Sequence, residues 1–503
     1  MRYHPLTCVF RIYQLIRNSL FVGIFLFIIK RNSDFWLFEY GRFVFVGAIL
    51  LRLIYIIVSW FVETYEWKER AFHIKKGIFV KHSSTIPFSR IQNVTRHTTL
   101  FHKIFGLTSI TFETAMDGED DAITFHVVSK QYAAFLLDLV KVEESQVPEV
   151  EEKKETEPQV EEVKESVNRV ITNRNIHFEP SKRDLFKASF TSLSFLAIIP
   201  IVTALYDLFG PLIPDSEQYE GVFYQIMNNR WVIFLLSIIA VVIAVIIGIL
   251  RTFSRYGRYR ISSNDTHIYI DRGLLAETHF AIEKQKIQGL EIEQTLMKRI
   301  FGLAEVKLIS SASPQSEEHT VSINSLYPFL PLKRAYQLIE ELLPDYHVSE
   351  SMNRLTKVSM YIKLIKPSWI WIIATLGLIY FKPAIFQIDA AWWLLSLTLL
   401  VIVIVNRMLD YLHTKYLISD DQLQWWHGGL TSRMFITKRK RVVEMSYSQS
   451  MLQKFFDLVS ISTMNRSTPT RIETIDDVPL DFAKTFQDWY LHRQKDTTYQ
   501  QNG

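Results

Sequence analysis

Long uncharged apolar runs alternate with polar stretches along this chain of 503 residues. The clearest run, residues 231–250, contains no charged side chain, and residues 390–405 are equally free of charge. Because a helix of roughly 20 apolar residues crosses a bilayer core about 30 Å thick, such runs predict membrane spans. Four more apolar runs are good candidates, although Arg17 lies near the start of the first, so the pattern predicts six spans: residues 12–29, 43–62, 188–205, 231–250, 369–381 and 390–405.

Short connections pair the six predicted spans as three hairpins. Tryptophan lies at several span ends, as in the aromatic belts of membrane proteins; these residues are Trp60, Trp231, Trp369, Trp392 and Trp393. The alternative, a set of buried core helices, is disfavoured because residues 231–250 have no polar face. Arg52 lies near the middle of the second span. It indicates either a polar contact inside a helix bundle or a tilted helix whose arginine reaches the headgroups, and both interpretations stay open.

Lysine and arginine flank the predicted spans mainly on one side, which orients the chain by the positive-inside rule. Residues 251–260 contain four arginines, whereas residues 206–229 contain four acidic residues and no basic one. The loop with Lys30, Arg31 and Arg42 is the exception. The bias predicts a multi-pass protein of the cell membrane with both termini and all three polar segments in the cytosol.

The three polar segments repeat one pattern at fixed spacing. Gly77 lies 13 residues before Arg90, and Ile91 lies 14 residues before Phe105. The second and third copies keep both spacings, although Asp457 replaces the glycine that comes after the phenylalanine in the other two. Equal spacing without gaps indicates one fold present three times. The landmarks are Gly77, Arg90, Ile91, Gln92, Phe105 and Gly106; then Gly273, Lys286, Ile287, Gln288, Phe301 and Gly302; then Gly428, Arg441, Val442 and Phe456.

Each copy has the same predicted order of elements. Strands lie on both sides of the landmarks, a short helical turn such as residues 98–105 lies between them, and an amphipathic helix ends the copy. Ile91, Phe105, Ile287 and Phe301 are expected to be buried. The apolar stripes of the final helices are Tyr132, Phe135, Leu136 and Leu139; Ala335, Leu338, Ile339 and Leu342; and Phe482, Phe486, Trp489 and Tyr490.

The landmarks resemble those of a known family. Ile-Pro-x-x-Arg-Ile-Gln at 86–92, followed by Leu-x-x-x-x-Phe-Gly-Leu at 100–107, is similar to the bacterial pleckstrin-homology-like (PH-like) membrane proteins of the YdbS/YdbT type, most closely the YdbT-like branch with three repeats. The resemblance implies three PH-like domains, each a partly open seven-stranded barrel closed by a C-terminal helix, beside six transmembrane helices. It implies no catalytic residues. It also implies a shorter partner of the same family with one PH-like domain, and a role in envelope integrity or defence.

The resemblance and the spans together predict the domain order. Residues 143–165 contain ten glutamates against three lysines, which predicts a flexible spacer, with an acidic interaction site as the alternative. The predicted segments are a hairpin (1–62), a PH-like domain (63–142), the acidic linker (143–180), a hairpin (181–251), a PH-like domain (252–346), a hairpin (347–409), a PH-like domain (410–495) and a frayed tail (496–503).

Residues suited to catalysis or metal binding form no recognisable set. No glycine-rich phosphate loop and no His-Glu-x-x-His occur, and Cys8, the single cysteine, cannot build a disulfide or a thiolate metal site. The acidic cluster at 117–121 lacks the spacing of a calcium loop. His97 and His102 are expected on the surface. The sequence therefore predicts no enzyme, no cofactor and no metal site, and its net charge of +4 favours no nucleic-acid partner.

Basic residues gather at two of the repeats. They are Lys438, Arg439, Lys440 and Arg441 in the third copy and Lys75, Lys76 and Lys81 in the first. Each basic residue near an anionic membrane contributes about 1 kcal/mol of attraction, so contact with lipid or with an acidic partner is one interpretation. A solvated strand edge whose lysines prevent strand pairing is the other.

Three functions remain open at this point. The first is a non-enzymatic membrane scaffold that binds a partner protein or anionic lipid. The second is a six-helix transporter or lipid-handling protein in which Arg52 lines a pathway. The third, an enzyme, is disfavoured because chemistry needs polar groups placed together in a pocket, whereas the recurring residues are those a fold requires.

Overall fold

The computed structural model describes residues 1–29, 36–78, 80–114, 122–144, 174–191, 230–310, 325–382, 391–467 and 470–492. The chain forms two compact units, residues 1–281 and 282–503, and the division falls inside the predicted second PH-like domain. The acidic cluster at 117–121, most of the linker and the C-terminal tail lie outside the described residues.

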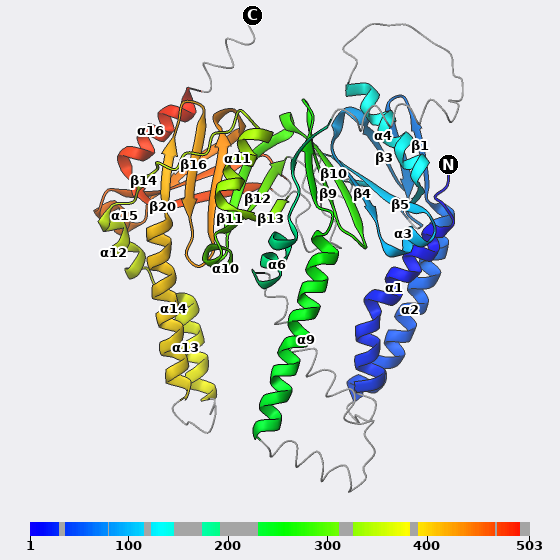
Figure 1. The fold of residues 1–503 in the computed structure, drawn as a ribbon, viewed down its shortest axis with the longest axis horizontal. Coiled ribbons are helices and arrows are strands. Elements are labelled where there is room, and N and C mark those ends of the chain that lie inside the picture. Colours follow the sequence, from blue (N-terminus) through cyan, green and yellow to red (C-terminus); the bar gives the residue numbers. More distant parts are fainter. Residues whose placement is uncertain are drawn as a thin grey trace, which may run out of the picture. The chain divides into compact units, whose positions relative to one another are not determined.

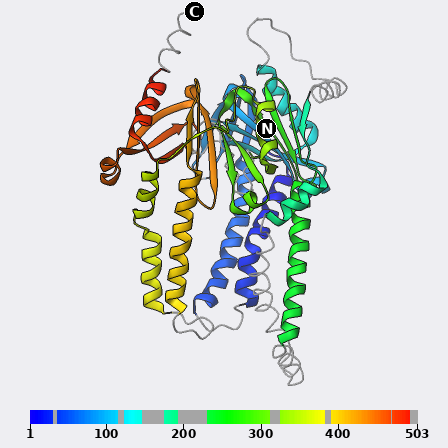
Figure 2. The same ribbon diagram turned by 60° about the vertical axis from the view of Figure 1, so that its left-hand side comes forward.

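Four helical segments of the described chain are long and apolar enough to cross a membrane. In the first unit, α1 (Leu6–Ile24) continues into the π-helical turn η1 (Phe25–Ile29) and lies beside α2 (Trp36–Val62). In the second unit, α12 (Lys357–Ile365) and α13 (Trp369–Phe381) form one segment, and α13 packs against α14 (Ala391–His413). Both hairpins are plain in Figures 1 and 2.

The prediction of six spans is therefore met only in part. The third predicted span lies outside the described residues except for its first four positions, which end α6 (Lys182–Thr191). The fourth forms the continuous helix α9 (Arg230–Tyr256), which packs against α6 but is not among the four candidate spans.

Each repeat contains a first sheet, a short 3-10 turn, a second sheet and a closing helix. The first repeat has β1 (Thr64–Lys68), β2 (Ala71–Lys76), β3 (His82–Pro87), η2 (Phe88–Arg90), β4 (Ile91–Thr98), α3 (Leu100–Ile104), β5 (Leu107–Thr114), β6 (Ala122–Ser129) and α4 (Lys130–Glu144). Its small core joins both sheets to α4 through Phe72, Phe112, Phe125 and Leu136.

The later repeats keep this order and add one strand at the start. The second has β7 (Asn175–Phe178), β8 (Arg260–Ser263), β9 (His267–Arg272), β10 (Glu277–Glu283), η5 (Lys284–Lys286), β11 (Ile287–Gln294), α10 (Leu296–Ile300), β12 (Leu303–Ser310), β13 (Ser325–Pro331) and α11 (Leu332–Leu342). The third has β14 (Asn353–Arg354), β15 (Lys415–Ile418), β16 (Gln422–His427), β17 (Ser432–Lys438), η6 (Arg439–Arg441), β18 (Val442–Ser448), α15 (Met451–Phe455), β19 (Leu458–Asn465), β20 (Arg471–Pro479) and α16 (Leu480–Leu491).

The described strands form no closed barrel, which corrects the predicted architecture. Instead, the second sheet of one repeat continues into the first sheet of the next. One seven-stranded sheet has the order β6-β5-β4-β10-β9-β8-β7, and the other has the order β13-β12-β11-β17-β16-β15-β14. The physical reason is that the strands before and after each 3-10 turn belong to different sheets. Without the next repeat, β4 and β11 would therefore be open edges. An open edge presents unpaired N–H and C=O groups, and the next repeat pairs with them.

The closing helices bury the stripes that their spacing predicts. Ala335, Leu338, Ile339 and Leu342 of α11 are all buried. In α4, Leu136 is fully buried while Tyr132, Phe135 and Leu139 pack at the margin of the core. In α16, Phe486 and Trp489 are buried, and Phe482 and Tyr490 lie beside them. The helical spacing of apolar residues was thus a reliable guide to these helices.

Candidate interaction surfaces

The turn glycines of the three repeats are equivalent. Gly77, Gly273 and Gly428 have φ values of 100°, 97° and 113°. A Cβ on these residues would lie 1.9, 1.8 and 2.3 Å from the carbonyl oxygen of the third residue onward, too close for any side chain. Only glycine adopts such a turn without strain. The predicted alignment of the repeats is confirmed at this position.

The phenylalanine landmark is also equivalent, but the prediction that it is buried is wrong. Ile91 and Ile287 are buried as expected. Phe105, Phe301 and Phe456 instead lie at the ends of α3, α10 and α15 as their C-caps and are 49%, 48% and 44% exposed. The next residue in each case has a positive φ: Gly106 (67°), Gly302 (65°) or Asp457 (52°).

Each short helix points a polar residue toward the protein interior. Its large apolar residues therefore lie on the exposed side of the helix. The third residue of each helix is buried: His102, Lys298 and Gln453. His102 Nε2 lies 2.8 Å from the His126 carbonyl oxygen, and Lys298 Nζ lies 2.7 Å from Glu305 Oε2. Gln453 Nε2 donates to Asp477 Oδ1 at 2.8 Å. The expectation that His102 is a surface residue is therefore wrong.

The exposed side of each short helix carries large apolar residues, and we name these three sets the short-helix tips. They are Leu100, Ile104 and Phe105; Leu296, Ile300 and Phe301; and Met451, Phe455 and Phe456. The helix that carries the first tip packs against a candidate span. Phe101 of α3 stacks with Tyr13 of α1 at a centroid distance of 5.8 Å and contacts Phe10 at 5.4 Å.

Two junctions between repeats use the same contacts. At the first junction, β4 pairs with β10, and Lys103 Nζ donates to the Leu274 carbonyl oxygen at 2.9 Å. At the second junction, β11 pairs with β17, and Arg299 Nη2 donates to the Gly429 carbonyl oxygen at 3.4 Å. Lys103 and Arg299 are both fourth in their short helices, and both acceptors come directly after the turn glycine. These two basic residues are not among the sequence landmarks, although each lies two positions before the landmark phenylalanine of its repeat.

The second junction also contains a network of ion pairs. Glu291 on β11 is nearly buried and pairs with Arg471 on β20, while Lys307 on β12 lies 2.6 Å from Glu293. Arg433 on β17 lies 3.6 Å from Glu291, so the network crosses between repeats. Burial alone would raise the pKa of Glu293, but the hydrogen bond and charge of Lys307 outweigh it and lower that pKa.

The first junction also contains a buried carboxyl group, but the pKa of this group is raised where that of Glu293 is lowered. Glu113 on β5 accepts a hydrogen bond from Asn93 at 3.1 Å and one from Thr95 at 3.4 Å, both from β4. Burial raises its pKa to about 7, against the weaker opposing effect of these two hydrogen bonds. No cation pairs with Glu113 among the described residues.

The basic run of the third repeat lies largely within contacts of the protein. Lys438 is buried, pairs with Asp345 at 3.0 Å and lies over the Tyr346 ring. Arg441 donates to the Gln285 carbonyl oxygen, and Arg439 lies over the Trp489 ring. Lys440 alone of the four is exposed. The hydrophilic run thus does not form one free surface, since Lys438 and Arg441 point toward the second repeat.

The remaining predicted residues have varied surroundings. Lys75, Lys76, Lys81 and Arg90 are exposed, Lys286 pairs with Glu283 at 2.6 Å, and Gln288 is buried. The backbone of Gln92 lies in β4, and its side chain lies outside the described residues. Arg52 is exposed on α2 and lies over the Tyr55 ring at 5.0 Å. Among the described residues, no group of His, Cys, Asp and Glu has the geometry of a metal site.

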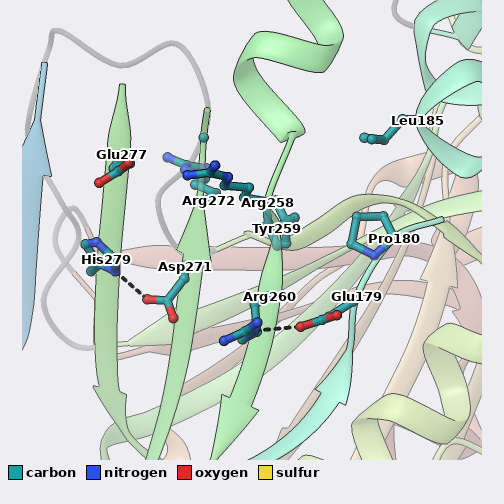
Figure 3. Close-up of a pocket in the computed structure, with 11 residues that line it drawn as sticks. Glu179, Pro180, Leu185, Arg258, Tyr259, Arg260, Asp271, Arg272, Glu277 and His279 are labelled. Carbon is teal, nitrogen blue, oxygen red and sulfur yellow. Dashed lines mark hydrogen bonds and ion pairs between the residues drawn. The ribbon is translucent and has the colours of Figure 1, made fainter. Parts of the chain in front are cut away.

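A cavity of about 520 Å³ opens beside the first sheet of the second repeat (Figure 3). Arg260 donates to Glu179 at 2.6 Å, and His279 Nδ1 lies 2.7 Å from Asp271 Oδ1. Arg258 and Arg272 also line this cavity (Figure 3).

Comparison with known proteins agrees with the three repeats. The family model described as Bacterial PH domain matches three times, at residues 20–143, 217–345 and 372–494. The chain is 26% identical over 507 residues to the UPF0699 transmembrane protein YdbT of Bacillus subtilis (strain 168), which covers 98% of this chain and 99% of that protein. No solved structure matches. The chain is a membrane protein with three PH-like repeats, and it belongs to the bacterial PH domain family.

Proposed function

We propose that this protein is a non-enzymatic membrane scaffold whose PH-like repeats bind a partner membrane protein. The expected partner is a shorter protein of the same family with one PH-like domain, and the complex would support envelope integrity or defence against membrane-active compounds. One observation carries the proposal: consecutive repeats bind each other twice by the same strand pairing and the same basic contact. A fold that associates with copies of itself is suited to binding a further copy on another chain.

Affinity capture of the tagged full-length chain from solubilised membranes tests this proposal. A second protein with a bacterial PH domain should co-purify in a fixed ratio, and loss of either protein should sensitise cells to membrane-active peptides to a similar degree. Capture of no PH-domain protein would contradict the proposal. A turnover abolished by mutation of a single polar residue would contradict its non-enzymatic part.

We also propose that the repeats contact the membrane surface through the short-helix tips. Large apolar side chains on a tip lower their free energy by entering the interfacial region of a bilayer, as interfacial helices do. The contact between α3 and α1 supports this proposal, because α1 is a candidate span. Exposed Lys75, Lys76, Lys81 and Lys440 would add attraction to anionic lipid.

Spin labels test the membrane contact. In a Cys8→Ser background, a nitroxide attached at Ile104 or Ile300 should be more accessible to oxygen than to an aqueous nickel chelate in nanodiscs. Ile472, another exposed isoleucine, on β20, is the matched control and should show the reverse. Tips that are accessible to the nickel chelate would exclude the contact.

We propose in addition the finer topology: six spans in three hairpins with both termini cytosolic. The basic flanks of the spans support it. Reporter fusions after Val62, Arg251 and Asp410 should all report the cytosolic side. An extracellular signal from any of the three would exclude this arrangement.

A further inference from the structure

The third repeat ends in an edge that is covered in the first two repeats. In the second repeat, β11 is paired on both sides, and its side chains are buried at all positions but one. In the third repeat, the equivalent strand β18 is the outer strand of the sheet β18-β19-β20. Its only buried residue is Val442, and Tyr447 is 57% exposed. Within the described chain, no strand pairs with its outer side, although Tyr490 Oη of α16 donates to the Val443 carbonyl oxygen at 2.7 Å.

The third repeat also keeps two other features that the second repeat has at its junction. Gln449 Nε2 donates to the Leu458 carbonyl oxygen at 2.9 Å, just as Gln294 donates to the Leu303 carbonyl oxygen at 2.8 Å in the second repeat. Lys454 is the fourth residue of α15, the position of Lys103 and Arg299. Its side chain is exposed and has no acceptor in the described residues.

Strand β18 lacks most features that protect natural sheet edges. It contains no proline, lysine or arginine, and its one charged residue, Glu444, lies at the bulge near its start. Exposed edge strands of this length normally carry such protection, because they otherwise pair with other chains. The outer strand β3 of the first repeat, which is equivalent to the paired strands β10 and β17, differs, since it ends in Pro87 and begins directly after Lys81.

We propose that β18 and Lys454 form a docking site for the first sheet of a PH-like repeat on another polypeptide. The partner strand would pair antiparallel with β18, as β17 pairs with β11, and Lys454 would donate to the carbonyl of the residue after the partner's turn glycine. The inference rests on the proposed function and names its binding surface.

Both strands that add to a preceding repeat within this chain carry a buried phenylalanine at the same position, which characterises the type of partner. Phe435 lies seven residues after its turn glycine, packs in the core of its own repeat and contacts Gly289 of β11, whose equivalent in β18 is Glu444. Phe280 has the same position in β10 and is buried as well. The equivalent residue of this chain's own β3 is Ser84, so β3 lacks this feature of the strands that add to a repeat. The occupant is therefore a repeat of a different protein, with an aromatic or large aliphatic residue at this position.

Site-specific photo-cross-linking in membranes tests the site. Benzoylphenylalanine replaces Tyr447 in the full-length chain, and the matched control replaces Ile472 on β20, at the opposite edge of the same sheet. The Tyr447 probe should form an adduct with a peptide that begins directly after the turn glycine of a bacterial PH repeat in another protein. The control should not. Adducts with residues 82–87 of a second copy, with a protein outside the family, or with nothing would each overturn the proposal.

Variants of Lys454 separate the site from the proposed function. Lys454→Ala should reduce the adduct yield about tenfold, which corresponds to one lost charged hydrogen bond, and Lys454→Arg should restore it because arginine makes this contact at position 299. Lys484→Ala, on the exposed face of α16, should have no effect. If affinity capture succeeds while both Lys454 variants behave as wild type, this site is wrong and the scaffold function stands. If affinity capture finds no family member, both fail.

Discussion

Strands β11 and β18 have the same place in their repeats and opposite surroundings. β11 lies between β12 and β17 in a seven-stranded sheet, whereas β18 has β19 on one side only. Their sequences differ accordingly. Glu291 and Glu293 of β11 meet Lys307, Arg433 and Arg471 around the junction, while the equivalent residues of β18 are Ser446 and Ser448, both exposed. The comparison teaches that one backbone position is a buried junction where a following repeat pairs with it, as at β11, and an open edge where no described strand does, as at β18.

The largest expected effect comes from breaking the network at the junction. Glu291→Ala removes one of the two carboxylates that pair with Arg471, which keeps Glu473, and leaves Arg433 with Glu293 alone. Loss of these charged contacts should cost up to about 3 kcal/mol. Ser446→Ala, the equivalent change on β18, should alter stability by less than about 0.5 kcal/mol. Hydrogen exchange of the β11 and β12 amides in nanodiscs measures both. Equal effects of the two substitutions would show that β11 is not a junction strand.

The pH dependence of the two junctions should have opposite signs. The raised pKa of Glu113, from 4.5 to about 7, means that the folded protein binds more protons than the unfolded chain between these values. The contribution of Glu113 to the stability of the first unit should therefore fall as pH rises from about 4.5 through 7, whereas burial lowers the pKa of His102 and His126, which act in the opposite direction. Glu113→Gln should add about 3 kcal/mol at pH 8 and little at pH 4, as measured by thermal unfolding of the solubilised protein. A gain that does not depend on pH would contradict this account.

The carboxyl groups of the second junction should respond to pH in the opposite direction. Burial would raise the pKa of Glu473, but His427, whose Nε2 lies 3.5 Å away, and the charge and hydrogen bond of Arg471 outweigh it, so that its pKa is lowered, as is that of Glu293. A carboxyl group with a lowered pKa contributes stability above its unfolded pKa and loses it as pH falls through the folded pKa. Acid should thus reduce the stability that Glu293 and Glu473 contribute to the second unit while it increases the stability that Glu113 contributes to the first. Exchange rates measured unit by unit at pH 5 and pH 7 would separate the two trends.

A smaller effect is expected at the turn that accepts the Lys103 contact. Gly273→Ala places a Cβ against the Ala276 carbonyl oxygen at a φ of 97°, and such strain costs of order 1–3 kcal/mol. It should also shift the Leu274 carbonyl and weaken the first junction. Gly106→Ala is the matched control, since its φ is also positive but no atom lies within 4 Å of the added Cβ. The turn account would be wrong if Gly106→Ala were the more harmful change.

The smallest effect on folding is expected at the short-helix tips. Phe105→Ala removes a side chain that is half exposed, so it should cost less than about 1 kcal/mol, in place of the 3–5 kcal/mol expected for a buried phenylalanine. The double substitution Phe105→Ala and Ile104→Ser should instead release the tip from the bilayer. A nitroxide label at Leu100 should then become measurably less accessible to oxygen. A large loss of stability would place Phe105 back in the core.

Periodicity and spacing predicted the repeats, the turns and the closing helices, since each depends on local rules. The junctions could not be predicted in this way, because strand pairing between repeats depends on contacts far apart in sequence. The short helices misled for a physical reason. Leu100 and Phe105 look like core residues, but His102 occupies the inward face and directs them outward. The basic run at 438–441 was similarly ambiguous, because Lys438 finds its partner Asp345 only in the folded chain.

Hydrogen exchange of β11 and β18 in the same molecule tests the central claim most directly. In nanodiscs, amides of β11 (Ile287–Gln294) should be strongly protected, and those of β18 (Val442–Ser448) on its outer side should exchange rapidly. After addition of the co-purified PH-domain protein, β18 should become protected while β11 stays unchanged. Strong protection of β18 in the isolated chain, or no gain when the partner binds, would contradict the claim that this array of repeats grows by strand addition at its open edge.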